Sequence, residues 1–213
     1  MNRKIPTMPL ISETGLKTSL ATFRGKYVVL APFLTLCQEM CPITTGAFIA
    51  LRHDVNAAGL GNKVVFVEIS VDPWRDSPGR LRAYSRRFGA TWPLLTGTLP
   101  ELQRFWKYFG VYFQKVPEPQ PPGTDWWTGK KLTFDIDHSD GFILISPNGN
   151  ERFLTASAPN LHCHLAPNLK GLLDSTGINN LCHPAADTWT VPEALNSISW
   201  LVGQHIPPQA AKT

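Results

Sequence analysis

The pattern of apolar positions divides the chain into alternating strands and helices. Residues 25–33 and 63–71 are short, nearly continuous apolar runs, which is typical of strands that are buried on both faces. Between them, residues 44–58 place apolar side chains at helical spacing, and Gly59 and Gly61 follow as stop signals. A buried strand, a helix and a second buried strand therefore open the predicted core.

The rest of the chain continues this alternation. The pattern predicts helices at 79–88, 99–109 and 192–204, and strands at 92–96, 111–116, 132–137, 141–146 and 151–154. A hairpin is expected within residues 7–26, around Glu13-Thr14-Gly15. Strands alternating with helices indicate an α/β fold with a mixed sheet flanked by helices and preceded by this hairpin. We expect one domain over residues 1–213.

Two segments interrupt the pattern. Residues 117–131 are rich in proline and cannot form a helix. Residues 155–191 are polar and rich in Gly, Asn and Pro. We interpret residues 155–191 as an insertion before the last helix, in the C-terminal half of the chain.

Composition excludes some functions. The formal charge is +4 in 213 residues and the basic residues are scattered, so we expect no nucleic-acid binding. The sequence has no run of 18 apolar residues, and its first residues lack the apolar core of a signal peptide. We therefore expect no membrane span in this chain.

Two cysteines lie at the first predicted strand–helix junction. Cys37 and Cys41 are four residues apart, and Pro42 follows at once. Unpaired N–H groups at a helix start favour the thiolate form. If both residues belong to the first helical turn, their sulfur atoms can approach each other. The pair suits a disulfide or a two-thiolate metal seat, and the alternative is two small buried apolar side chains.

A metal held by two thiolates needs a further ligand, and His138 is the candidate. It lies in the acidic stretch 135–140, at the junction between two predicted strands. Asp137 could hydrogen-bond the other ring nitrogen and fix the tautomer. The alternative is a solvated turn histidine. A set of two cysteines and one histidine is soft, so it suits Cu(I) and could take Cu(II) or Zn.

Four motifs resemble the Sco/SenC family, copper chaperones of cytochrome c oxidase with a thioredoxin-like fold. They are CQEMCP at 37–42, VEISVDPWRDSPGRLRAYSRRFG at 67–89, WPLLTG at 92–97 and DHSDGFILISPNG at 137–149. Their order and spacing agree with the family from about residue 7 to 154, and the helix at 192–204 fits its closing helix. The insertion at 155–191 is not an expected family feature.

The resemblance implies a thioredoxin-like fold and a function. Cys37, Cys41 and His138 would bind copper, as Cu(I) or Cu(II), and deliver it to the copper-accepting subunit of cytochrome c oxidase. A copper donor protein or a thiol reductant would be further partners. The family location is extracytoplasmic: the periplasm or cell envelope, with a membrane tether outside this sequence, or the mitochondrial intermembrane space.

The insertion holds the other two cysteines, in His162-Cys163-His164 and Cys182-His183. A disulfide between Cys163 and Cys182 would close a loop that otherwise has little support. It would also indicate a location outside the cytosol. Free thiols, or a metal site that uses some of the three histidines, are the alternatives.

An enzyme is the rival interpretation. In a thiol–disulfide oxidoreductase, Cys37 and Cys41 would cycle between dithiol and disulfide, and His138 would be incidental or would tune a thiolate pKa. The approach to the first cysteine also resembles peroxiredoxins, but the arginine that such a site needs cannot be placed. Trp126-Trp127 either packs on the sheet or offers an apolar patch to a partner.

Overall fold

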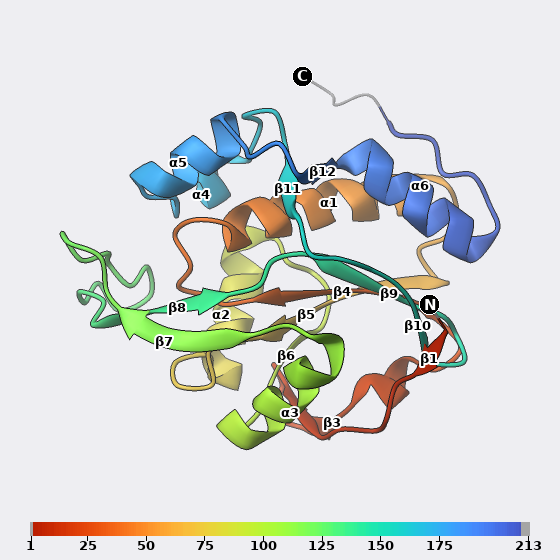
Figure 1. The fold of residues 1–213 in the computed structure, drawn as a ribbon, viewed down its shortest axis with the longest axis horizontal. Coiled ribbons are helices and arrows are strands. Elements are labelled where there is room, and N and C mark those ends of the chain that lie inside the picture. Colours follow the sequence, from red (N-terminus) through yellow and green to blue (C-terminus); the bar gives the residue numbers. More distant parts are fainter. Residues whose placement is uncertain (1, 210–213) are drawn as a thin grey trace.

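The computed structural model describes residues 2–209, and a mixed β-sheet forms its centre (Figure 1). Eight strands within these residues form the sheet in the order β1-β10-β9-β4-β5-β6-β2-β3. They are β1 (Arg3–Lys4), β2 (Leu10–Ser12), β3 (Lys17–Thr18), β4 (Tyr27–Phe33), β5 (Val64–Ser70), β6 (Leu94–Thr96), β9 (Phe142–Ile145) and β10 (Asn150–Thr155). Strands β4, β5 and β6 are parallel, and the outer pairings are antiparallel.

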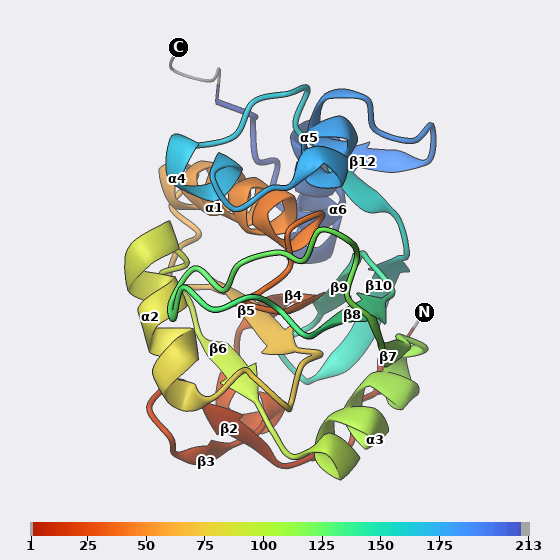
Figure 2. The ribbon, with the colours of Figure 1, turned by 90° about the vertical axis from the view of Figure 1, so that its left-hand side faces the viewer.

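Helices cover both faces of this sheet. They are α1 (Cys41–Ala57), α2 (Pro78–Phe88), α3 (Leu99–Phe109), α4 (Pro167–Lys170), α5 (Ser175–Cys182) and α6 (Val191–Val202), with a 3-10 turn at Leu20–Phe23. Figures 1 and 2 show α1 and α6 on one side of the sheet and α3 on the opposite side. The predicted mixed sheet flanked by helices is confirmed, and so is the N-terminal hairpin, which β2 and β3 form.

Local signals in the sequence set the ends of the helices. Ser77 accepts a hydrogen bond from the backbone N–H of Arg80, and Pro78 occupies the first turn of α2. Gly89 ends α2 in the left-handed conformation, at φ 80°. The start of α6 has a capping box between Thr190 and Glu193. These ends agree with the predicted helices to within two residues.

The parallel pairing of β4 with β5 determines where the chemistry lies. Their register runs from Tyr27 opposite Val64 to Phe33 opposite Ser70. Parallel strands carry their carboxyl ends to the same edge of a sheet. The loop after β4, which holds Cys37, therefore lies beside the loop after β5, and the N–H of Val71 donates to the carbonyl of Phe33 over 2.9 Å.

The strand that carries His138 pairs with an unexpected partner. Strand β8 (Phe134–His138) forms a separate two-stranded antiparallel sheet with β7 (Phe113–Pro117). The sequence interpretation placed His138 at a junction between two successive strands, 132–137 and 141–146. Those segments do not pair, because the chain turns at Gly141 (φ 123°) and β9 enters the main sheet between β10 and β4.

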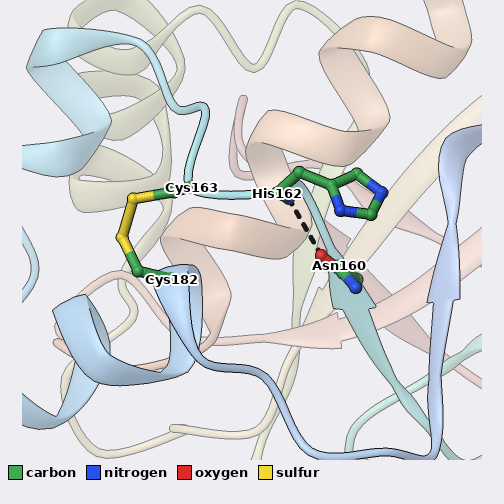
Figure 3. The surroundings of a disulfide bond; sticks show 4 residues. All are labelled: Asn160, His162, Cys163 and Cys182. Carbon is green, nitrogen blue, oxygen red and sulfur yellow. Dashed lines mark hydrogen bonds between the residues drawn. A yellow bond between two sulfur atoms is a disulfide. The ribbon is translucent and has the colours of Figure 1, made fainter.

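Residues 155–191 contain short elements that the apolar pattern did not predict. Strands β11 (Ala158–Asn160) and β12 (Thr188–Thr190) pair in parallel, and α4 and α5 lie between them in sequence. A disulfide joins Cys163 to Cys182, as the preferred account of this segment expected (Figure 3). The elements have three to eight residues, which is too short for an apolar period to emerge.

Candidate metal centre

The loop between β4 and α1 positions both thiols. Helix α1 begins at Cys41, three residues earlier than the apolar pattern predicted, and Cys37 lies before it. The condition that both cysteines belong to the first helical turn is therefore not met. The Cys37 sulfur instead accepts hydrogen bonds from the N–H groups of Met40 and Cys41, at 3.3 and 3.2 Å. These are N–H groups that a helix start leaves unpaired.

His138 completes the group from the opposite side. Its Nε2 atom lies 3.5 Å from the Cys41 sulfur. One ligand atom each from Cys37, Cys41 and His138 lie within 4.8 Å of one another, and no other group of this kind occurs among residues 2–209. The sequence therefore predicted three residues that the fold brings together, although 97 positions separate Cys41 from His138.

The hydrogen bond of the second ring nitrogen of His138 fixes the tautomer of the ring. Its Nδ1 atom lies 2.9 Å from the carbonyl oxygen of Ser139. A carbonyl can only accept, so Nδ1 carries the proton and Nε2 is the atom that can bind a metal. The expectation that Asp137 would be this partner is wrong. Asp137 is exposed, because adjacent residues of a strand point to opposite faces.

The two thiols differ in acidity. A hydrogen bond from the Cys41 side chain, followed by the hydrogen bond and charge of His138, lowers the pKa of Cys37 in spite of burial. Burial, followed by the neighbouring Cys37, raises the pKa of Cys41. Burial opposes protonation of His138, but the Cys37 thiolate and then Asp140 outweigh it and raise the pKa of His138 to about 9. These shifts favour a Cys37 thiolate beside a His138 imidazolium in the metal-free site.

An acidic cleft opens beside Cys37 and His138. It has a volume of about 550 Å³ and includes Cys37 and His138 in its wall. Six carboxylates also line it, and none of the lysines or arginines among residues 2–209 does: Glu39, Glu118, Asp135, Asp137, Asp140 and Asp174. Burial, and then the charges of Cys37 and three of these carboxylates, raise the pKa of Glu39 to about 7. The cleft therefore favours cations.

Two further residues, Asp76 and Trp126, hold the loop from behind, and the sequence predicted neither of these contacts. Asp76 is buried and accepts hydrogen bonds from the N–H and hydroxyl of Thr35 and from the hydroxyl of Ser70. The indole N–H of Trp126 donates to the carbonyl of Thr35 over 2.6 Å. Asp76 belongs to the VDPWRDSP motif, so the sequence marked it as part of a motif. Only the fold shows that Asp76 reaches the loop between β4 and α1, here called the ligand loop.

The two tryptophans lie in different surroundings, and Trp126 packs on α2 rather than on the sheet. Trp126 packs against Tyr84 and Phe88, with ring centroids at 6.1 and 5.1 Å. Trp127 is 48% exposed. The second proposed metal site, in the insertion, does not form in the structure, because Cys163 and Cys182 are joined to each other.

Comparison with known proteins places the chain in a family. A sequence model described as SCO1/SenC matches residues 3–166. The chain belongs to the SCO1/SenC family. A curated relative, a putative copper-binding protein of Stutzerimonas stutzeri, is 29% identical over 150 residues, which are 70% of this chain and 68% of that protein.

Other Sco proteins extend the comparison. The protein sco1 of Schizosaccharomyces pombe is 30% identical over 140 residues, 66% of this chain but only half of that protein. The crystal structure of yeast Sco1 with copper bound superposes with a TM-score of 0.64 at 22% identity, and covers 99% of this chain and 95% of that one. This likeness confirms the thioredoxin-like fold of the family. Within residues 2–209, no helix has the length and apolarity needed to span a bilayer.

Proposed function

We propose that this chain binds one copper ion through Cys37, Cys41 and His138 and passes it to a partner protein. The observation that carries the proposal is the convergence of two sulfur atoms and one imidazole nitrogen within 4.8 Å of one another. Thiolates select Cu(I) by softness, and the imidazole nitrogen also suits Cu(II). Family membership supports the choice of copper, since a relative is named a copper-binding protein and related structures contain copper.

Copper would be the cargo of this protein, and the protonation of the three residues determines how it binds. Cys37 already favours the thiolate, whereas Cys41 and the Nε2 atom of His138 must each lose a proton before they can bind. Loading therefore releases protons, and the affinity rises with pH. The Ser139 carbonyl keeps Nδ1 protonated, so it directs Nε2 toward the ion.

The cleft supports release as well as binding. Three ligands leave a copper ion open to a further donor on the cleft side, where Cys37 and His138 line the wall. A partner can then replace these ligands with its own, one at a time, so the ion is never free. We propose that the acceptor is the copper-accepting subunit of cytochrome c oxidase, because one structural relative is described as a member of the Sco family of cytochrome c oxidase assembly proteins. A copper donor protein or a thiol reductant would prepare the site.

The same proposal includes the location and the domain organisation. The Cys163–Cys182 disulfide favours an oxidising compartment. Relatives include a mitochondrial SCO1 homolog and a bacterial lipoprotein. We place the chain outside the cytosol, in the cell envelope or the mitochondrial intermembrane space. We treat it as one domain, to which residues 155–191 are an addition.

Copper titration tests the proposal. The reduced protein should bind about one Cu(I) per chain in competition with a chromophoric chelator. His138→Ala should lose Cu(II) binding, because only two thiolates remain. Protein alkylated at Cys37 and Cys41 should bind no copper. The control for His138→Ala is His53→Ala, which should behave like the wild type because His53 is a surface residue of α1 outside the cleft. Stoichiometric copper after alkylation of both thiols would contradict the proposal.

A thiol–disulfide oxidoreductase is the second candidate, and the unequal thiols favour it. Cys37 is partly exposed and its pKa is lowered, whereas Cys41 is 2% exposed. Cys37 would attack a partner disulfide, and Cys41 would then displace the partner thiol, leaving a Cys37–Cys41 disulfide and a reduced partner. Reduction of insulin with turnover, in protein that binds no copper, would favour this function.

A further inference from the structure

The segment between Cys163 and Cys182, here called the cross-linked segment, contacts the ligand loop backbone to backbone. The N–H of Asp174 donates to the carbonyl of Gln38 over 2.9 Å. Gly177 lies so close that a Cβ atom there would be 2.3 Å from the Gln38 oxygen and 3.0 Å from the Cα of Glu39. The loop therefore has the cross-linked segment as a wall on this side, in addition to Asp76 and Trp126.

The same segment is anchored to α1. A Cβ atom at Gly46 would lie 2.4 Å from the Leu165 side chain and 3.8 Å from that of Leu169. Leu169, in α4, is fully buried. Figure 2 shows α4 and α5 beside α1 on the outer side of the molecule. The cross-linked segment thus packs on the helix that carries Cys41 and also on the loop that carries Cys37.

Its own internal bonds keep this wall in shape. The disulfide joins residues 19 positions apart (Figure 3). The N–H of Cys163 also donates to the carbonyl of Leu181 over 3.0 Å. The Asp174 carboxylate caps α5 by accepting the Gly177 N–H over 2.8 Å. Asp174 also lines the acidic cleft. The start of α5 therefore connects the cross-linked segment to both the ligand loop and the cleft.

We propose that the cross-linked segment positions the ligand loop, with Gly177 and Asp174 as positioning residues, and so sets the place of Cys37 for copper. The inference rests on the proposed function. The Cys37 sulfur is held by the N–H groups of Met40 and Cys41. A displacement of Gln38 and Glu39, which link Cys37 to Met40, therefore moves the sulfur. A glycine in a helix is less favourable than alanine by about 1 kcal/mol, and close backbone contact accounts for its presence here.

Paired glycine substitutions test the proposal. Gly177→Ala should weaken Cu(I) affinity about tenfold, as loss of support around a metal ligand does, and should shift the thiolate-to-Cu(II) charge-transfer band. Gly171→Ala is the matched control in the same segment, since its Cβ would meet nothing closer than 3.4 Å and its φ is −68°. Wild-type affinity and band in a folded Gly177→Ala protein would overturn the proposal, and so would equal losses in both variants.

Two further measurements keep the test decisive. If Gly177→Ala does not fold, Cys163→Ser/Cys182→Ser should show the same weaker binding and shifted band, and unchanged values would overturn the proposal. The alkylation rate of Cys37 in metal-free protein should change in these variants and not in Gly171→Ala. Wild-type protein that binds no copper would contradict the proposed function, and the alkylation rates would still decide whether the segment positions the loop.

Discussion

At the scale of single residues, two thiols that look equivalent in the sequence differ in their surroundings. Cys37 accepts two backbone N–H groups and lies in the cleft, whereas Cys41 is buried at the first position of α1. The sequence predicted which side chains converge, because each is a metal-ligating type within a recognisable motif. It could not predict the asymmetry or the Ser139 carbonyl, since both depend on backbone direction.

The asymmetry predicts different reactivity in the metal-free protein. Iodoacetamide should modify Cys37 well before Cys41 at pH 7, because only the thiolate reacts and Cys37 is the more acidic and more exposed thiol. The rate at Cys37 should fall only at a pH below the usual thiol range. His138→Ala should slow it at pH 7, because the variant lacks a charge that lowers the pKa of Cys37. Peptide mass spectrometry measures both rates, and equal rates at the two thiols would refute this.

A buried acid away from the cleft predicts the pH dependence of stability. Glu68 in β5 is fully buried and accepts hydrogen bonds from Thr45 and Trp92. Burial outweighs these bonds and raises its pKa to about 7. The folded state therefore favours the protonated acid. The stability that this group contributes is complete below about pH 4.5 and is lost as the pH rises through about 7, an effect of about 3 kcal/mol.

Glu68→Gln removes the ionisation while it keeps a group that can bond both partners. Above pH 7 the variant should be more stable than the wild type, and the difference should disappear toward pH 5. Urea unfolding at a series of pH values measures the two free energies of unfolding. A constant difference across this range would show that Glu68 does not titrate as described.

At the scale of elements, the centre depends on three segments that the sequence described unequally well. The long apolar strands β4 and β5 were predicted to within two residues at each end. Helix α1 was predicted to start late, because the hydrogen bonds to the Cys37 sulfur that organise its start leave no apolar period. The pairing of β8 with β7 was missed, because 16 residues separate them in sequence and neither strand alternates clearly.

The support of the loop by Trp126 gives a prediction at this scale. Trp126→Phe keeps an aromatic ring against Tyr84 and Phe88 but removes the N–H that bonds the Thr35 carbonyl. The free energy of unfolding should fall by about 1 kcal/mol, the usual net value of such a bond. Trp127→Phe is the control, because its ring is half exposed, and it should change the value by less than about 0.5 kcal/mol. Equal effects in chemical denaturation would contradict this role.

At the scale of the whole molecule, the fold separates charges that the composition mixes. The chain carries a net charge of +4, yet six carboxylates gather around the cleft. They come from the ligand loop, from residues 118–140 and from residues 155–191. Composition could not predict this, because it contains no information on which residues become neighbours. The family fold and the three residues of the proposed copper site, by contrast, followed from motifs.

X-ray absorption spectroscopy of the copper-loaded protein tests the central claim most directly. The account predicts one copper per chain, with two sulfur atoms at about 2.3 Å and one nitrogen at about 2.0 Å, the bond lengths of thiolate and imidazole ligands. The nitrogen should be lost in His138→Ala and one sulfur in Cys41→Ser. A copper shell without sulfur, or one that His138→Ala leaves unchanged, would contradict the account.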